Sequence, residues 1–323
     1  MIRRQLLCCL LLSRVLVAPA QVASFLEIVP DARAASLGGA SLATEPDAWA
    51  AAGHHAKLAS RALPFALAYT YSPVINKTFP GSRMHAAAAR VPLGKRGAMT
   101  VAFKRVSLGE LLVERVDGEV ILKPADMSVD LGYARLLAAG LAAGASIRYI
   151  VSDLGEEGTT VGRGAALNAS VCYRREFSGR GASWTVGAAA TNIGPGISYG
   201  GDSRGSLPAR VTAAAAIRLP LHANHDARCT VEYSYRFAPR GERAREVMTG
   251  VEQVLYGACS LRLGYHRGNT GSGPAEFISA GCGARAYGLA VDFSYQRATR
   301  AAAALDKIAR LSISLTPGMF NNK

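Results

Sequence analysis

The sequence predicts an all-β protein: a closed, antiparallel transmembrane β-barrel of about fourteen strands. Two observations carry this prediction. The chain contains short stretches in which apolar and polar residues alternate, and the gaps between them switch regularly between brief and long. Tyr287 to Gln296 is the clearest stretch, because every second residue up to Tyr295 is apolar and those in between are small or polar. A period of two places successive side chains on opposite faces of a strand.

The predicted strands have lengths that suit tilted strands crossing a bilayer. They span residues 63–72, 83–92, 97–106, 126–137, 140–151, 164–176, 182–191, 209–219, 227–237, 248–256, 259–266, 277–285, 287–296 and 308–315.

Six short connections alternate with seven long ones along this series. Gly94-Lys95-Arg96 is one of the short turns, and residues 107–125 form the longest loop. Barrels of the bacterial outer membrane have short periplasmic turns and long external loops, with an even number of strands. A soluble Greek-key sandwich has no reason to sort its loops in this way. The pattern therefore favours a membrane barrel over the sandwich.

The N-terminus has the features of a cleavable export signal. Arg3 and Arg4 precede an apolar run, and Ala20 ends a small-x-small cleavage site, so we expect the mature chain to begin near Gln21. After this signal no apolar run of eighteen residues occurs, which excludes transmembrane helices although 50% of the residues are hydrophobic. The predicted organisation is a signal peptide (1–20), an N-terminal segment (21–62) and an outer-membrane barrel (63–323).

The chain is basic, with a formal net charge of +14 that falls to +11 when the three arginines of the signal are removed. No block is dense enough in Lys and Arg to indicate a nucleic-acid partner. Contact with outer-membrane lipid or lipopolysaccharide phosphates is one explanation of the excess. Ordinary solubility charge on long loops is the other.

The N-terminal segment is long enough to fold into the barrel as a plug. Fourteen strands enclose a lumen wider than one layer of side chains, so the lumen must be filled or admit water. Pro30 to Arg33 and Thr44 to Asp47 have polar turn chemistry that a lumen can satisfy. The alternative is a loose periplasmic arm.

The residue pattern gives little support to an enzyme, a cofactor site or a metal site. The chain has no Gly-x-Ser-x-Gly nucleophile turn and no phosphate-binding loop. His54 and His55 with Asp47 invite a metal site, but no third ligand has a useful spacing. Cys259 and Cys282 have the same parity on neighbouring strands, so a disulfide is conceivable, but a role as small apolar filler is favoured.

Two regions stand out as candidate partner-facing loops. One is Asn192-Ile193-Gly194, and the other contains Arg240, Arg243 and Arg245. Guanidinium groups suit carboxylates and phosphates, so the second loop can serve a partner surface or lipopolysaccharide. A solvated loop is the alternative.

The N-terminal segment contains an ordered set of short motifs: Phe25 to Ala34, then Gly38, Ser41 to Thr44 and Pro46-Asp47-Ala48. The set continues in order through Asn192-Ile193-Gly194 and Gly288 to Tyr295. This set resembles PorV-type outer-membrane proteins of the type IX secretion system. Its signature residues in the possible plug are Asp31, Ala32, Arg33, Gly38, Pro46, Asp47 and Lys57.

The resemblance implies a FadL-like barrel without enzymatic activity that works in protein export. Family members bind secreted cargo by its C-terminal signal domain and deliver it from the translocon to a surface attachment complex. This chain departs from the family pattern at two places. His54-His55-Ala56-Lys57 stands where the family shows Asn-Pro-Ala-Lys, and the sequence near Pro239 is rich in arginine. A PorQ-like paralogue is therefore an alternative within the family. Outside it, the alternatives are a FadL-like transporter of hydrophobic small molecules and a structural porin.

Overall fold

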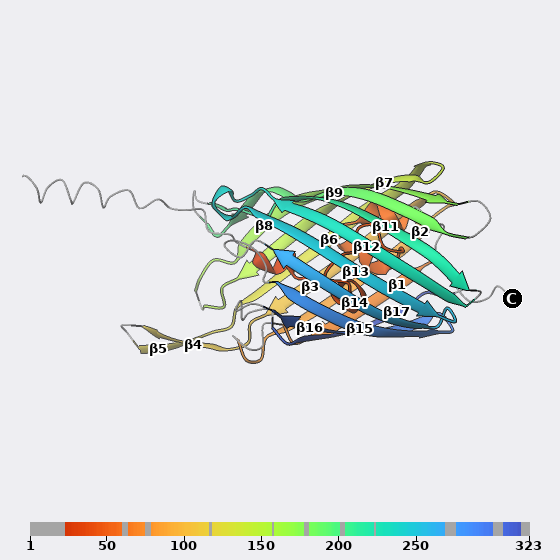
Figure 1. Cartoon of the computed structure of the whole chain (residues 1–323). Coiled ribbons are helices and arrows are strands. Elements are labelled where there is room, and N and C mark those ends of the chain that lie inside the picture. The colour runs from red at the N-terminus through yellow and green to blue at the C-terminus, as the bar shows by residue number, and fades with distance from the viewer. Residues whose placement is uncertain are drawn as a thin grey trace, which may run out of the picture.

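The structure is a computed structural model that describes residues 23–59, 64–74, 79–115, 118–156, 158–177, 181–200, 204–222, 224–268, 276–299 and 306–317. It is a barrel of long, tilted strands with short helices inside (Figure 1). The predicted signal peptide, residues 1–20, lies outside the described residues. No helix of the described part is long and apolar enough to cross a membrane.

Fourteen strands form the wall of the barrel. They are β1 (Ala66–Ser72), β2 (Arg83–Leu93), β3 (Gly97–Ser107), β6 (Ala125–Ala138), β7 (Leu141–Asp153), β8 (Gly162–Glu176), β9 (Ser183–Ser198), β11 (Arg210–His222), β12 (His225–Arg236), β13 (Ala244–Leu255), β14 (Cys259–Gly268), β15 (Phe277–Ala286), β16 (Leu289–Ala298) and β17 (Ile308–Leu315).

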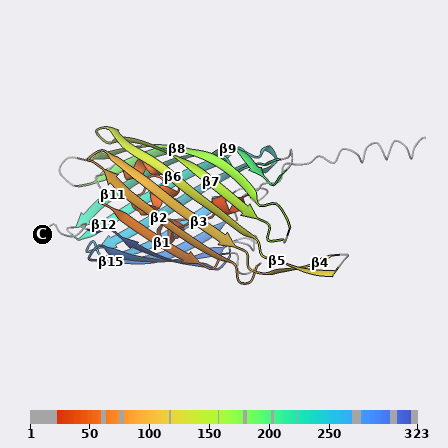
Figure 2. The same ribbon diagram turned by 180° about the vertical axis from the view of Figure 1, so that it is seen from behind.

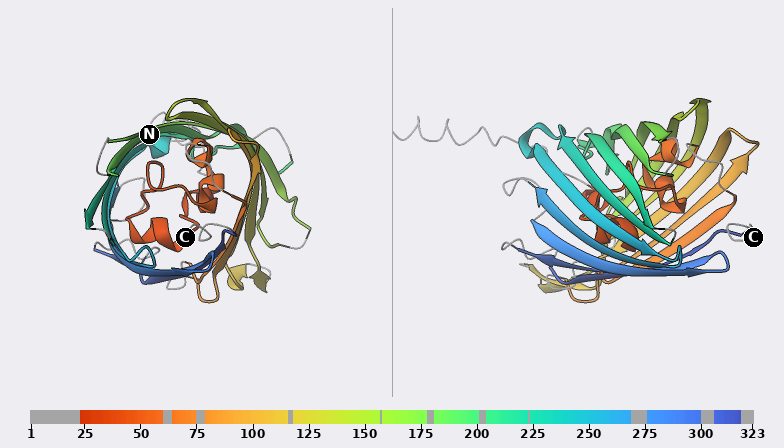
Figure 3. Two further views of the ribbon diagram at one scale, coloured as in Figure 1. Left: turned by 90° about the vertical axis from the view of Figure 1, so that its right-hand side faces the viewer. Right: turned by 45° about the vertical axis from the view of Figure 1, so that its right-hand side comes forward.

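Each wall strand pairs antiparallel with its neighbours, and the first strand closes on the last. β1 pairs with β17 from Leu67 opposite Leu315 to Tyr71 opposite Leu311, while β9 pairs with both β8 and β11. The closed ring is visible in the end view of Figure 3. Closure matters in a membrane because an unpaired backbone amide costs several kcal/mol in hydrocarbon. The predicted closed barrel of fourteen strands is confirmed.

The long loops contain strands that the alternation did not reveal. β4 (Leu111–Arg115) and β5 (Gly118–Leu122) form a separate hairpin between β3 and β6, and β10 (Arg204–Gly205) pairs only with β9. The hairpin projects from the barrel at the end where the long loops lie (Figure 2). Tyr287, which was predicted to start a strand, lies instead in the two-residue turn with Gly288, where both residues have a positive φ.

The burial pattern is the reverse of that in a soluble protein. In β16, Leu289, Phe293 and Tyr295 are exposed on the outside, whereas Ser294 and Gln296 are buried. The other wall strands also have large apolar side chains outside, and their inner faces carry polar or small side chains, such as Ala86 and Ala88 of β2. An apolar outer band around a polar interior is the pattern of an outer-membrane barrel.

The N-terminal residues 23–59 lie inside this ring, as both views of Figure 3 show. They form four short helices: η1 (Ser24–Glu27), α2 (Ala32–Ser36), η2 (Ala48–Ala52) and η3 (His55–Leu58); a fifth, η4 (Arg240–Glu242), lies in a loop. We call residues 23–59 the lumen segment.

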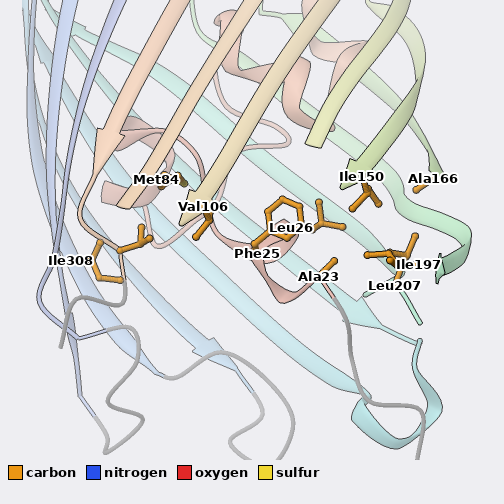
Figure 4. Close-up of a cluster of buried hydrophobic side chains, with 11 residues drawn as sticks. Ala23, Phe25, Leu26, Met84, Val106, Ile150, Ala166, Ile197, Leu207 and Ile308 are labelled. Carbon is orange, nitrogen blue, oxygen red and sulfur yellow. The ribbon is translucent and has the colours of Figure 1, made fainter. Parts of the chain in front are cut away.

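The lumen segment starts at the long-loop end of the barrel. There Phe25 and Leu26 pack among apolar side chains from the strand ends, including Met84, Val106 and Ile150 (Figure 4). The segment then leads to β1, which begins at the short-turn end. From Ala23 onward, the chain therefore enters the barrel wall only after it has passed through the lumen.

Candidate functional site

Helix α2 ties the lumen segment to the seam between β1 and β17. The Asp31 carboxylate caps the helix by accepting a hydrogen bond from the Ala34 amide at 2.7 Å. The Ala32 amide donates to Ser312 Oγ at 2.9 Å, and Ser312 Oγ lies 2.5 Å from Thr70 Oγ1. The segment thus contacts both strands that close the barrel.

Arg33 is the centre of the main ionic network. It donates to both carboxylate oxygens of Glu252, from Nε at 3.2 Å and from Nη2 at 3.0 Å, and its Nη1 donates to Asp47 at 3.0 Å. Glu252 also accepts from Arg262 at 2.7 Å and from Arg228 at 3.0 Å. Three guanidinium groups therefore converge on one buried carboxylate, and the lumen segment supplies one of them.

Gly38 marks the closest approach of the segment to the wall. Its φ is +72°, and a Cβ at this position would lie 2.4 Å from the backbone oxygen of Tyr265. Its amide donates to Ser279 Oγ at 3.1 Å. On the wall side, a Cβ on Gly264 would lie 2.1 Å from the Gly38 nitrogen. Only glycine fits either position.

Lys57 and Glu232 hold the loop between α2 and η2. Lys57 Nζ donates to the carbonyl of Ser41 at 2.8 Å and to Thr44 Oγ1 at 3.1 Å. Glu232, from β12, accepts the amides of Ser41 and Leu42 at 2.8 and 2.9 Å. The loop is thus fixed from within the segment and from the wall.

The departure at His54-His55 is accommodated by the wall. His55 is fully buried in η3, and its Nδ1 lies 2.9 Å from Thr100 Oγ1. Gly132 and Gly144 leave room for it, because a Cβ on Gly132 would lie 2.6 Å from the ring. Among the described residues, no group of three or more His, Cys, Asp or Glu is placed to hold a metal ion.

Asp31 and Asp47 are neighbouring carboxyl groups in the lumen, and their pKa values shift in opposite directions. Burial raises the pKa of Asp31 to about 6, and the Asp47 carboxylate adds to this rise. Burial also acts to raise the pKa of Asp47, but Lys57 and Arg33 hold it below its usual range. Burial lowers the pKa of His54 to about 3. At neutral pH Asp47 is therefore the charged partner of Arg33, and His54 is neutral.

The signature residues are thus brought together by the structure. Ala32, Arg33 and Gly38 contact the wall directly, while Asp31, Asp47 and Lys57 act within the segment. Sequence reasoning did not find their partners Glu252 and Glu232. The only available signal was that both glutamates fall on the polar parity of their strands.

The prediction that Asn192-Ile193-Gly194 form a loop is wrong. These residues lie in β9, where Asn192 has a φ of +59° beside irregular pairing with β8. The Asn192 side chain is buried: its Oδ1 accepts from Arg148 Nη1 at 2.5 Å and its Nδ2 donates to the Pro208 carbonyl at 3.1 Å. Arg148 in turn pairs with Asp130 and donates to Ala52 of the lumen segment. Asn192 therefore faces the lumen.

We expect Asn192→Ala to destabilise the barrel by about 1–3 kcal/mol, because it leaves Arg148 with an unmet donor in a buried site and puts Ala at a positive φ. Asn192→Gly keeps the backbone conformation and removes only the side chain, so it should lose less. Urea titration of the detergent-extracted protein, read as the folded fraction on unboiled gels, measures both. Equal losses would show that the backbone conformation contributes nothing.

The second candidate loop is exposed. Arg240 lies in η4 and Arg243 follows it, while Arg245 is already on the outer face of β13. Their role as partner contacts stays a prediction. The disulfide considered from the strand register is not formed, since Cys259 and Cys282 are both free.

Comparison with known proteins identifies both a family and a fold. The family model described as "Type IX secretion system protein PorV" matches residues 15–241, well over half of the chain. No curated protein matches.

Among solved structures, the chain is similar to the Ralstonia pickettii toluene transporter TbuX, with 11% identity, a TM-score of 0.55, and coverage of 88% of this chain and 97% of that one. It is also similar to the Pseudomonas putida toluene transporter TodX, with 9% identity, a TM-score of 0.55, and coverage of 87% and 95%. The CymD monoaromatic hydrocarbon channel matches with 11% identity, a TM-score of 0.53, and coverage of 88% and 95%. At these identities the likeness establishes the fold alone, and it confirms the predicted FadL-like barrel.

Proposed function

Because this chain belongs to the PorV family of type IX secretion system proteins, we propose that it binds secreted cargo by the cargo's C-terminal signal domain and delivers it to the surface attachment complex. Its place as a barrel of the outer membrane follows from the family and the fold. The translocon, the attachment complex and the cargo are its proposed partners, and its proposed role is not enzymatic.

The β4–β5 hairpin is the observation that best supports a surface docking role. Leu112 and Ile121 pair across the two strands and are 63% and 55% exposed. An isolated two-stranded hairpin is at best marginally stable in water, so a hairpin with uncovered apolar side chains gains stability when a partner covers it. It projects beyond the lipid-facing wall at the long-loop end (Figure 1). A cargo domain that has crossed the membrane would meet it there.

The lumen gives less support to the alternative, a transporter of hydrophobic small molecules. The cavity beside the lumen segment has a volume of about 170 Å³ and is lined by six carboxylates and six Lys or Arg side chains, among them Lys104, Asp130 and Arg210. Charged and hydrogen-bonding groups retain water, and an apolar solute cannot replace those hydrogen bonds. A hydrocarbon path would require this lining to rearrange.

Gene deletion followed by fractionation of the culture separates the two functions. We expect signal-bearing cargo to accumulate in the periplasm of the deletion strain, and the wild-type gene to restore its release. Normal secretion together with lost uptake of a lipid-like compound would overturn the proposal in favour of the transporter.

The hairpin can be tested in the same strain. We expect the double variant Leu112→Ser, Ile121→Ser to restore cargo release about tenfold less well than wild type, since apolar anchors of this size each contribute roughly 1–3 kcal/mol to an interface. Tyr256→Ser with Tyr287→Ser is the matched control, because these exposed side chains lie in turns at the opposite end. Equal release with both double variants would exclude the hairpin as the docking surface.

A further inference from the structure

One side of the barrel carries exposed arginines on its outer surface, near the long-loop end. Within the described wall strands, eight Lys or Arg side chains are exposed, and all eight are arginines. Only Arg135 and Arg175 lie near the short-turn ends. The six near the long-loop ends are Arg83, Arg105, Arg163, Arg245, Arg267 and Arg297.

Five of these six belong to one continuous part of the wall. β13, β14, β16, β2 and β3 carry one arginine each, and all lie within the run of neighbouring strands β13-β14-β15-β16-β17-β1-β2-β3. We call these five side chains the arginine arc. Opposite the arc, the outer surface of β8, β9 and β11 is lined largely by small residues such as Ala169, Ala188 and Ala213.

Four side chains of the arc form two pairs with the same geometry. Arg105 lies opposite His85 in the register of β2 and β3, so Arg83, two residues away, is its diagonal neighbour. Arg267 lies opposite Val247 in the register of β13 and β14, so Arg245 is its diagonal neighbour in the same way. Diagonal neighbours on one face of a sheet are roughly 7–8 Å apart, within reach of long side chains. Two guanidinium groups at this separation can hold one phosphate between them.

The charge of the arc has no counterpart among the residues that the structure describes. None of its five side chains makes an ion pair or hydrogen bond with another side chain of the described residues. Near the same strand ends, no carboxylate of the described wall strands is exposed on the outer face. Tyr71 and Tyr295 are exposed on strands of the arc, and Tyr69 Oη lies 2.7 Å from His85 Nδ1. Tyrosines at this level are typical of the interface between hydrocarbon and headgroups.

We propose that the arginine arc binds the phosphate groups of lipopolysaccharide in the outer leaflet, with one phosphate at each diagonal pair. The long loops of an outer-membrane barrel face the cell exterior, so the arc lies at the headgroups of the outer leaflet. Phosphorylated glycolipid is the anionic lipid of that leaflet. Of the exposed arginines in the described wall strands, only Arg135 and Arg175 lie on the side of the inner leaflet. This inference depends on the orientation of the barrel and not on its role in export.

Titration of the purified, detergent-solubilised barrel with bis-phosphorylated lipid A tests the proposal. We expect Arg83→Gln with Arg105→Gln, and Arg245→Gln with Arg267→Gln, each to weaken binding about tenfold, since each removes charge-assisted hydrogen bonds to one phosphate. Arg135→Gln with Arg175→Gln removes the same charge at the other end and should change binding less than about twofold. Heat-modifiable gel migration verifies that every variant is folded.

Titrations with two other lipids identify which lipid the arc binds. The affinity of wild type for dephosphorylated lipid A should be no higher than that of the variant that lacks both arginine pairs. Wild type should also bind phosphatidylglycerol at least about tenfold more weakly than it binds lipid A. Equal binding of phosphatidylglycerol would overturn the assignment to lipopolysaccharide. Unchanged lipid A binding in both pair variants would overturn it as well.

Discussion

Glu252→Gln should lower the stability of the folded barrel by about 3–5 kcal/mol, the range found when one partner of a buried ion pair is removed. The reason is the convergence of Arg33, Arg228 and Arg262 on this one carboxylate. The substitution keeps the shape of the side chain, so the loss reports charge rather than a cavity. Three guanidinium groups would then be buried around a neutral amide.

The folded fraction of the detergent-extracted protein on unboiled gels, measured against urea, gives this loss. Glu110→Gln is the matched control, because Glu110 pairs with Lys123 at 2.8 Å but both side chains are largely exposed; this variant should unfold at the same urea concentration as wild type. The double variant Arg33→Gln, Glu252→Gln should lose less unfolding free energy than the sum of the two single variants, because it removes one of the unpaired buried charges. A strictly additive result would mean that the two side chains do not interact.

Gly38→Ala is expected to displace the lumen segment from β14. The new Cβ would meet the Tyr265 backbone, which cannot yield as a side chain can, at a cost of about 1–3 kcal/mol. The positive φ adds about 1–2 kcal/mol for any residue other than glycine. Together these terms are large enough to detach the segment locally while the wall stays closed.

Limited trypsin digestion of the folded barrel measures this displacement. Cleavage after Arg33 should become faster than in wild type, whereas the unboiled barrel should still migrate as a folded species. Gly241→Ala is the control, because a Cβ at Gly241 meets nothing within 4 Å. Unchanged protection at Arg33 would show that Gly38 does not set the position of the segment.

Most of the wall was predictable from the sequence, because each wall strand has its own local signal. Alternation alone places Phe293 outside and Ser294 inside, and this requires no knowledge of which strands are neighbours. The switch between short and long gaps then orders the strands as a meander. The hairpin β4–β5 escaped prediction because Leu111-Leu112-Val113 and Val120-Ile121-Leu122 are apolar without alternation.

The contacts of the lumen segment were not predictable, because they join residues far apart in the chain. Arg33 and Glu252 are separated by 219 positions, and many inward-facing polar residues compete as partners for any one charge. Asn192 was misplaced for a related reason. Its neighbours Gly194, Pro195 and Gly196 have the composition of a turn, but the Arg148 network holds this stretch in an irregular strand.

The passage of residues 23–59 through the ring has a consequence for biogenesis. The ribosome makes these residues before any strand, yet the cylinder is complete only when the last strand, β17, meets the first. Ser312 Oγ, which accepts the Ala32 amide, reaches Thr70 of β1 only after that meeting, so the full connection from the segment to both seam strands cannot exist earlier. Insertion machinery must therefore either close the cylinder around a lumen segment that is already in place, or close it first. In the second case the lumen segment enters afterwards through one end of the barrel.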